Sequence, residues 1–178
     1  MTLSQGEGYT GAEREGLSGM NDSIVTPALI GAIRSQYPLD WRGIHGQGHW
    51  ERVRRVGLAL AAKTGADVRV VELFAFLHDS CRLNDGRDPE HGPRAVKFAA
   101  SLRGAFFDLE DDKFELLCQA MAGHTEGRLD ARADVGTCWD ADRFDLGRVS
   151  ISPEPRFFSM PAAREAAFFS WAARGGAP

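Results

Sequence analysis

The chain has 178 residues, and its 43% hydrophobic and 26% charged side chains are ordinary for one globular domain with a single core. Its 21 basic and 25 acidic residues give a net charge of −4, which argues against an extended nucleic-acid surface but not against a local basic patch. The three cysteines are odd in number and widely spaced, so we expect free thiols in a reducing compartment, and no apolar run reaches the ~18 residues of a membrane span.

The N-terminal stretch differs in composition from the rest of the chain. Residues 1–23 are rich in Gly, Ser, Thr and Glu without an apolar period, which predicts a flexible arm before one helical domain over residues 24–178. The stretch lacks the basic and apolar regions of a secretory signal, so we expect a cytoplasmic protein that does not bind membranes. Met1 and Met20 are both kept as candidate starts, and a homodimer is kept as an alternative to a monomer.

Two helices are predicted before the apolar centre of the chain. The first begins at Thr26-Pro27, with threonine as the N-cap and proline in the first turn. The second is expected from about His49 to Thr64, because the three glycines within residues 43–48 oppose an earlier start. His49 therefore lies in a first turn, and His45 lies on the loop before it.

The central helix is the most informative stretch. Asp67 opens an apolar run that extends to Leu77 and is apolar nearly all round, as in a fully buried helix. The run ends in His78-Asp79, a polar pair that is costly to bury unless something uses it. A divalent metal is the commonest user, since it binds imidazole nitrogen and carboxylate oxygen together. The alternative is a helix whose polar end simply faces water.

Further helical segments follow the central pair. Asp88-Pro89 is predicted to cap a helix with His91 in its first turn, and the next helix ends at His124. A charged loop leads to residues 135–145, and residues 161–173 are predicted to form a covering helix. Because no strand shows period-two alternation, the fold class is predicted to be all-α, with six or seven helices and no significant sheet.

The histidines suggest a metal site. Four of the five fall at predicted helix termini, and helical domains commonly build metal sites from helix ends that share a cavity. With two carboxylates the predicted set is His49, His78, Asp79, His91, His124 and Asp142. Six ligands exceed the four that zinc takes. One metal with three or four protein ligands, and two metals bridged by a carboxylate, both stay open.

The order His49, His78-Asp79, Asp142 resembles the H…HD…D signature of the HD-domain superfamily of metal-dependent phosphohydrolases. The contexts HWERV, FAFLHDS and WDADRFDLGR match as well, so the resemblance covers residues 40–150. It implies a single compact HD-type helical domain in which these four residues hold the metal, the last of them being Asp142 and not Asp140.

His91 and His124 fall in order where two-metal members of that superfamily place two further histidines. The alternative for each is a helix-terminal histidine that is bonded to its own backbone. His45 and His49 are four residues apart, but the intervening glycines argue against the continuous helix that a zinc-type spacing needs. We therefore expect His45 to contact substrate or to support a ligand.

Hydrolysis of a phosphate ester also needs positive charge for the developing oxyanion. Three arginines close to the predicted ligands are expected to supply this charge: Arg52, Arg82 and Arg143. Asp79 is expected to be catalytic as well as a metal ligand. The alternative is that Arg52 and Arg143 pair with acidic neighbours. Asp85 and Asp140 are candidates for a general acid or base.

The resemblance implies a metal-dependent phosphohydrolase that acts on a small phosphorylated metabolite, with a nucleotide as the expected substrate. Its cofactor would be one or two divalent ions drawn from Mn, Fe, Zn, Co, Ni or Mg. Three alternatives are kept: a di-iron oxygenase on the same scaffold, a non-catalytic metal-bound sensing module, and a structural helical protein with incidental histidines.

Overall fold

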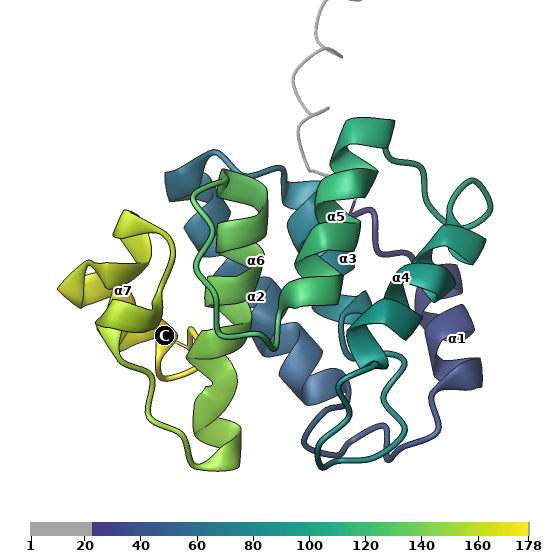
Figure 1. Ribbon diagram of the computed structural model, residues 1–178, viewed down its shortest axis with the longest axis horizontal. Helices are drawn as coiled ribbons and strands as arrows, with labels where there is room; N and C mark the ends of the chain where they lie inside the picture. Colours follow the sequence, from purple (N-terminus) through teal and green to yellow (C-terminus); the bar gives the residue numbers. More distant parts are fainter. Residues whose placement is uncertain (1–22, 178) are drawn as a thin grey trace, which may run out of the picture.

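The computed structural model describes residues 23–177, and these form an all-helical fold, which confirms the predicted fold class (Figure 1). The α-helices of this part are α1 (Pro27–Gln36), α2 (Gln47–Thr64), α3 (Val68–Leu77), α4 (His91–Leu102), α5 (Asp111–Gly123), α6 (Ala133–Phe144) and α7 (Ala166–Ala172). Three 3₁₀ helices lie between α6 and α7: η1 (Asp145–Val149), η2 (Pro155–Phe157) and η3 (Pro161–Arg164). The described residues contain an isolated bridge but no sheet, and none of their helices is long and apolar enough to cross a membrane.

The predicted arm and the alternative start at Met20 lie outside the described residues, except for Ser23. The Ser23 hydroxyl donates a hydrogen bond of 2.9 Å to Glu72 on α3, and Arg54 of α2 donates to the same carboxylate at 2.8 Å. Ser23 is therefore tied to the helical domain by a side-chain hydrogen bond.

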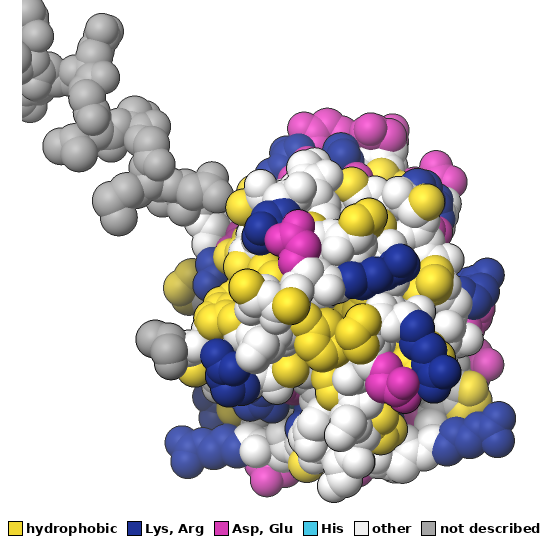
Figure 2. All heavy atoms as spheres, turned by 90° about the vertical axis from the view of Figure 1, so that its left-hand side faces the viewer, with side chains coloured by type: hydrophobic (Ala, Val, Ile, Leu, Met, Phe, Trp, Pro, Cys, Tyr) yellow, Lys and Arg dark blue, Asp and Glu magenta, His cyan; other side chains and the backbone are white. Residues whose placement is uncertain are grey.

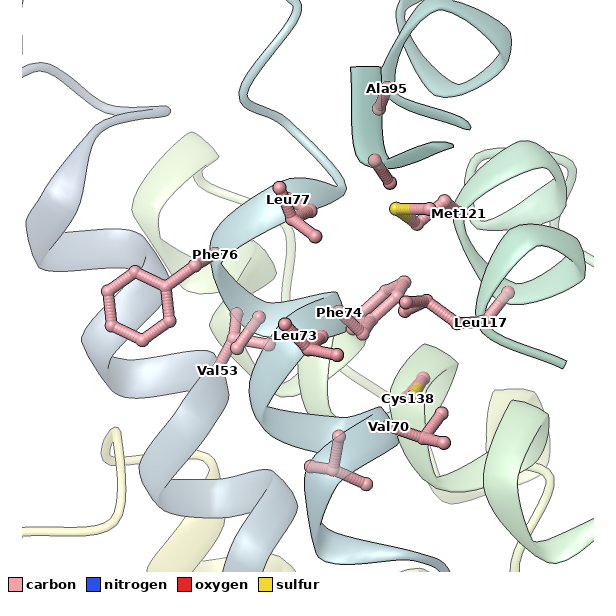
Figure 3. Close-up of a cluster of buried hydrophobic side chains, with 14 of the residues drawn as sticks. Val53, Val70, Leu73, Phe74, Phe76, Leu77, Ala95, Leu117, Met121 and Cys138 are labelled. Atoms are coloured by element: carbon pink, nitrogen blue, oxygen red, sulfur yellow. The ribbon is translucent and has the colours of Figure 1, made fainter. Parts of the chain in front are cut away.

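Helix α3 lies at the centre of the molecule, against α2, α5 and α6 (Figure 1). Its N-cap is Asp67, whose side chain accepts the backbone N–H of Arg69, and every residue from Val70 to Leu77 is buried. Figure 3 shows Phe74 lying against Leu117 of α5, on the side of α3 away from α2. The apolar run thus has partners around its circumference, as its composition predicted.

Two helix starts differ from the predicted ones. Helix α2 begins at Gln47, two residues early, because Gly46 takes an extended N-cap conformation where a Cβ atom would overlap the carbonyl oxygen of Trp41. Helix α4 begins only at His91, because the Asp88 carboxylate does not cap the helix but accepts the backbone N–H of Leu83 at 2.9 Å.

The single covering helix predicted over residues 161–173 is wrong. The chain forms η3, takes an extended conformation at Glu165, and then forms α7. The break lets buried Ala163 and Phe168 join one apolar cluster with Phe144 and Phe158. We call η2, η3 and α7, which pack around this cluster, the C-terminal lobe. The lobe forms the face seen in Figure 2, where hydrophobic side chains gather between charged ones.

Helices α4 and α5 approach each other closely at Gly92. A Cβ atom at this position would overlap the backbone carbonyl oxygen of Met121. A backbone group cannot change rotamer, so the overlap could be relieved only by moving the helices. Glycine is thus required for this contact, which lies beside His91.

We expect Gly92→Ala to lower the free energy of unfolding by about 1–3 kcal/mol, because overpacking must push the two helices apart. The matched control is Gly31→Ala on α1, where nothing lies within 4 Å of the added carbon and alanine favours the helix. Urea denaturation of both variants tests this, and equal stabilities for the two would contradict the close contact.

Candidate metal centre

The ligand positions predicted from the sequence come together in one place. His49 lies in the first turn of α2, His78 is the C-cap of α3 and is followed by Asp79, His91 begins α4, His124 is the C-cap of α5, and Asp142 lies in the last turn of α6. None of the six side chains is more than 13% exposed. Five helices therefore contribute their ends to one buried polar cluster.

The first half of the cluster is built around two facing imidazoles. The Nε2 atoms of His49 and His78 lie 3.1 Å apart. Asp142 Oδ1 lies 3.4 Å and 3.7 Å from these nitrogens, and Asp79 Oδ2 lies 3.6 Å and 3.7 Å from them. The distances are those of a four-ligand group that one ion could draw together.

The second half repeats the arrangement with the other oxygen of Asp79. The Nε2 atoms of His91 and His124 lie 2.8 Å apart, and Asp79 Oδ1 lies 3.0 Å from the first and 3.5 Å from the second. Asp79 thus presents one carboxylate oxygen to each histidine pair. This is the position of a bridging carboxylate in a two-metal site.

All four histidines are oriented in the same way. Each Nδ1 atom faces an oxygen that only accepts: Asp145 Oδ2 at 2.7 Å for His49, the carbonyl of Phe74 at 3.0 Å for His78, the carbonyl of Asp88 for His91, and the carbonyl of Met121 at 2.7 Å for His124. Each Nδ1 therefore carries the ring proton, and each Nε2 keeps a lone pair for a ligand. Two such lone pairs face each other within each histidine pair, and they repel unless a cation or a proton lies between them.

Asp142 supplies a second sign of a cation site. Its Oδ1 atom is buried and has no hydrogen-bond partner among the described residues. Such an orphaned acceptor costs about 1–3 kcal/mol unless something satisfies it. The ligand types, the tautomers and this orphaned oxygen together fit a divalent metal.

The charge states of His78 and Asp79 at neutral pH agree with metal binding. Burial lowers the pKa of His78 to about 3 despite the nearby Asp79 and Asp142 carboxylates, so its imidazole is neutral. Burial alone would raise the pKa of Asp79, but His78, His124 and His91 outweigh it and hold that pKa well below the usual range. Neutral imidazole and ionised carboxylate are the forms that bind divalent ions.

His49 is held in place by a chain of two charged residues, Asp145 and Arg52, that the sequence did not reveal. Asp145 accepts the His49 ring proton and also two hydrogen bonds of 2.6 Å and 3.0 Å from Arg52. Arg52 was predicted to be catalytic, but its guanidinium group binds Asp145 and so helps to orient His49. This is the pairing alternative that was kept for it.

Of the other two predicted arginines, Arg82 contacts the His/Asp cluster directly, whereas Arg143 lies at the edge of the cluster. Arg82 Nε donates to Asp79 Oδ1 at 2.9 Å. Arg143 lines the same cleft, but its guanidinium donates to the carbonyl oxygens of Phe157, at 3.0 Å, and Arg128.

Arg148, which the sequence analysis did not single out, is better placed than Arg143. Its Nη2 atom lies 3.9 Å from Asp79 Oδ2. In the sequence, the only feature that pointed to Arg148 was its position shortly after Asp142, within the matching WDADRFDLGR segment.

The two remaining carboxylate candidates have different surroundings. Asp140 is fully buried, and burial raises its pKa to about 6, while its oxygens accept the backbone N–H groups of Ser159 and Met160, both at 2.7 Å. It anchors the C-terminal lobe and is not among the cleft-lining residues. Asp85 Oδ1 lies 3.0 Å from Nδ1 of His45, a cleft residue.

A cleft of about 270 Å³ opens directly onto the cluster. Its polar wall includes His45, Asp79, Arg82, His124, Asp142 and Arg148. Leu146 and Val149 add an apolar wall. A small molecule that enters the cleft therefore meets three arginines, Arg82, Arg143 and Arg148, together with the Asp79 carboxylate.

We expect Asp142→Ala to lose metal from the first half of the centre, whereas Asp140→Ala keeps the wild-type metal content. Asp140→Ala should instead lower the free energy of unfolding by about 1–3 kcal/mol, because two buried N–H donors lose their acceptor. Elemental analysis and urea denaturation of both variants test this. Loss of metal from Asp140→Ala with retention in Asp142→Ala would reverse the assignment.

The double variant His91→Ala with His124→Ala tests the second half. It should retain one metal per chain at His49 and His78 and lose the other, since the first pair keeps both of its carboxylates, Asp79 and Asp142. Metal content identical to that of the wild-type protein would show that the second half holds none.

No protein-family model, curated protein or solved structure matches this chain. The resemblance to the HD-domain superfamily therefore stands on the sequence motif alone. The metal centre stands separately, on the geometry of the chain's own residues.

Proposed function

We propose that this chain is a metal-dependent phosphohydrolase that acts on a small phosphorylated metabolite. One observation carries the proposal: a single carboxylate, Asp79, is shared by two histidine pairs at the base of a cleft that contains arginines. Arrangements with two metal positions and adjacent cationic side chains suit the displacement of one phosphoryl oxygen by another. The H…HD…D resemblance points to the same reaction.

The chain's own residues have distinct tasks in this proposal. The first ion would be held by His49, His78, Asp79 and Asp142, and the second by His91, His124 and Asp79. When bound, divalent ions supply Lewis acidity and bring the pKa of a bound water toward neutrality. Arg82 keeps Asp79 oriented through a hydrogen bond of 2.9 Å, and Arg148 places positive charge beside it for the phosphoryl oxygens.

The cleft favours a small substrate. Its volume of about 270 Å³ fits a phosphorylated metabolite, and a polymer would have to remain outside. Leu146 and Val149 offer apolar contact to the part of the substrate that does not react. A nucleotide, whose sugar separates a flat base from a charged phosphate, matches this division between a charged and an apolar wall.

The test is phosphate release by the purified chain from p-nitrophenyl phosphate and from nucleoside monophosphates. The protein is assayed with Mn, Fe, Co, Ni, Zn and Mg in turn. We expect turnover with at least one ion and none with Asp79→Asn. A fully metal-loaded protein that turns over no phosphate ester would contradict the proposal and leave a sensing module. Oxygen consumption by the iron-loaded protein alone would indicate the di-iron alternative.

Arg148→Ala should lower kcat/KM about tenfold or more, because a charge-assisted hydrogen bond of about 1.5–3 kcal/mol to the phosphoryl group is lost. The matched control is Arg156→Ala, whose side chain is 71% exposed and is not among the cleft-lining residues. Steady-state kinetics at fixed metal concentration provide the comparison. If the two variants lose equally little activity, Arg148 does not contact the phosphoryl group.

A further inference from the structure

One buried titratable group of the cleft has no task in the mechanism above. His45 lies on the loop before α2, and its side chain is only 6% exposed although it lines the cleft. Its Nδ1 atom lies 3.0 Å from Asp85 Oδ1, a carboxylate that can only accept, so Nδ1 carries the ring proton. Nε2 is therefore left with a lone pair, and the one hydrogen bond given for the ring within residues 23–177 is made by Nδ1.

The loop that carries this imidazole is held at several points. Tyr37 donates from its hydroxyl group to the carbonyl oxygen of His45 at 2.9 Å, and Arg148 donates to the preceding carbonyl of Ile44 at 3.0 Å. Gly46 completes the turn where no larger residue fits against Trp41. The position of the ring relative to the cleft is thus fixed by backbone contacts as well as by Asp85.

The ring is also in the protonation state that a base needs. Burial lowers the pKa of His45, and the nearby Arg82 and Arg148 charges act in the same direction. The hydrogen bond to Asp85 and the charge of Asp79 oppose the shift without cancelling it. At neutral pH, His45 is therefore a neutral imidazole that can accept a proton.

Resting on the proposed function, we infer that His45 is the general base of the reaction and that Asp85 is its positioning residue. Nε2 takes a proton from the attacking water while the water oxygen forms its bond to phosphorus. The phosphorus bond to the leaving oxygen breaks, the electron pair stays on that oxygen, and the oxygen takes a proton from solvent. The Asp85 carboxylate stabilises the imidazolium, which then returns its proton to solvent.

The experiment compares His45→Ala, His45→Gln and Asp85→Asn with wild-type protein, all loaded with the same metal and assayed on p-nitrophenyl phosphate. Loss of a general base should lower kcat about 10²–10⁴-fold in both His45 variants, with metal content and KM unchanged. Imidazole added to the buffer should restore part of the kcat of His45→Ala. Asp85→Asn should lower kcat less. The control is Arg42→Ala, an exposed residue of the same loop, with wild-type kinetics expected.

A second readout does not depend on turnover. Nitrogen-15 NMR of the metal-loaded wild-type protein should show His45 protonated at Nδ1 and unprotonated at Nε2. The opposite tautomer would overturn the base role. So would wild-type kcat in both His45 variants, or a kcat loss that accompanies metal loss and does not respond to imidazole. An inactive wild-type protein would instead reject the proposed function and the base role together, whereas an active one with unaffected variants rejects only the base role.

Discussion

The arrangement of the helix ends around Asp79 requires that the repulsion between facing imidazole lone pairs be relieved. Within each histidine pair the Nε2 atoms lie about as close as a hydrogen-bonded pair, at 3.1 Å and 2.8 Å, while their ring protons are committed to oxygens on the other side. A positive charge between each pair turns this repulsion into attraction. Because the four histidines lie at ends of α2, α3, α4 and α5, a bound cation would also hold these helix ends together. Metal binding would then stabilise the fold.

A proton would compete with a metal more strongly at His124 than at His78. Burial lowers the pKa of His124, but its hydrogen bond to Asp79 and the charges of Asp79 and Asp142 outweigh that effect and raise it. The pKa of His78 is lowered to about 3. A metal bound beside His124 would therefore compete with a proton there, whereas the imidazole of His78 is already neutral.

The features that sequence could predict are those carried by local patterns. The apolar run before His78 predicts α3, and the glycines before His49 place it at a helix start, so the two most buried ligands follow from local composition. The choice of Asp142 over Asp140 came only from the family resemblance, since both lie on one helix, and the geometry agrees because Asp142 lies 3.4 Å from His49. Contacts between distant segments left no local pattern. The contact from His49 to Asp145 spans 96 residues, and the break at Glu165 lies in an alanine-rich stretch whose composition favours a continuous helix.

The central claim is that cations lie on both sides of the Asp79 carboxylate. It is tested most directly by anomalous X-ray diffraction from crystals of protein purified without chelator, collected at the absorption edge of the metal found by elemental analysis. We expect two anomalous peaks, one among His49, His78 and Asp142 and one between His91 and His124, with Asp79 contacting both. A map without a peak at either histidine pair would contradict the account, because protons alone would then separate the facing imidazoles.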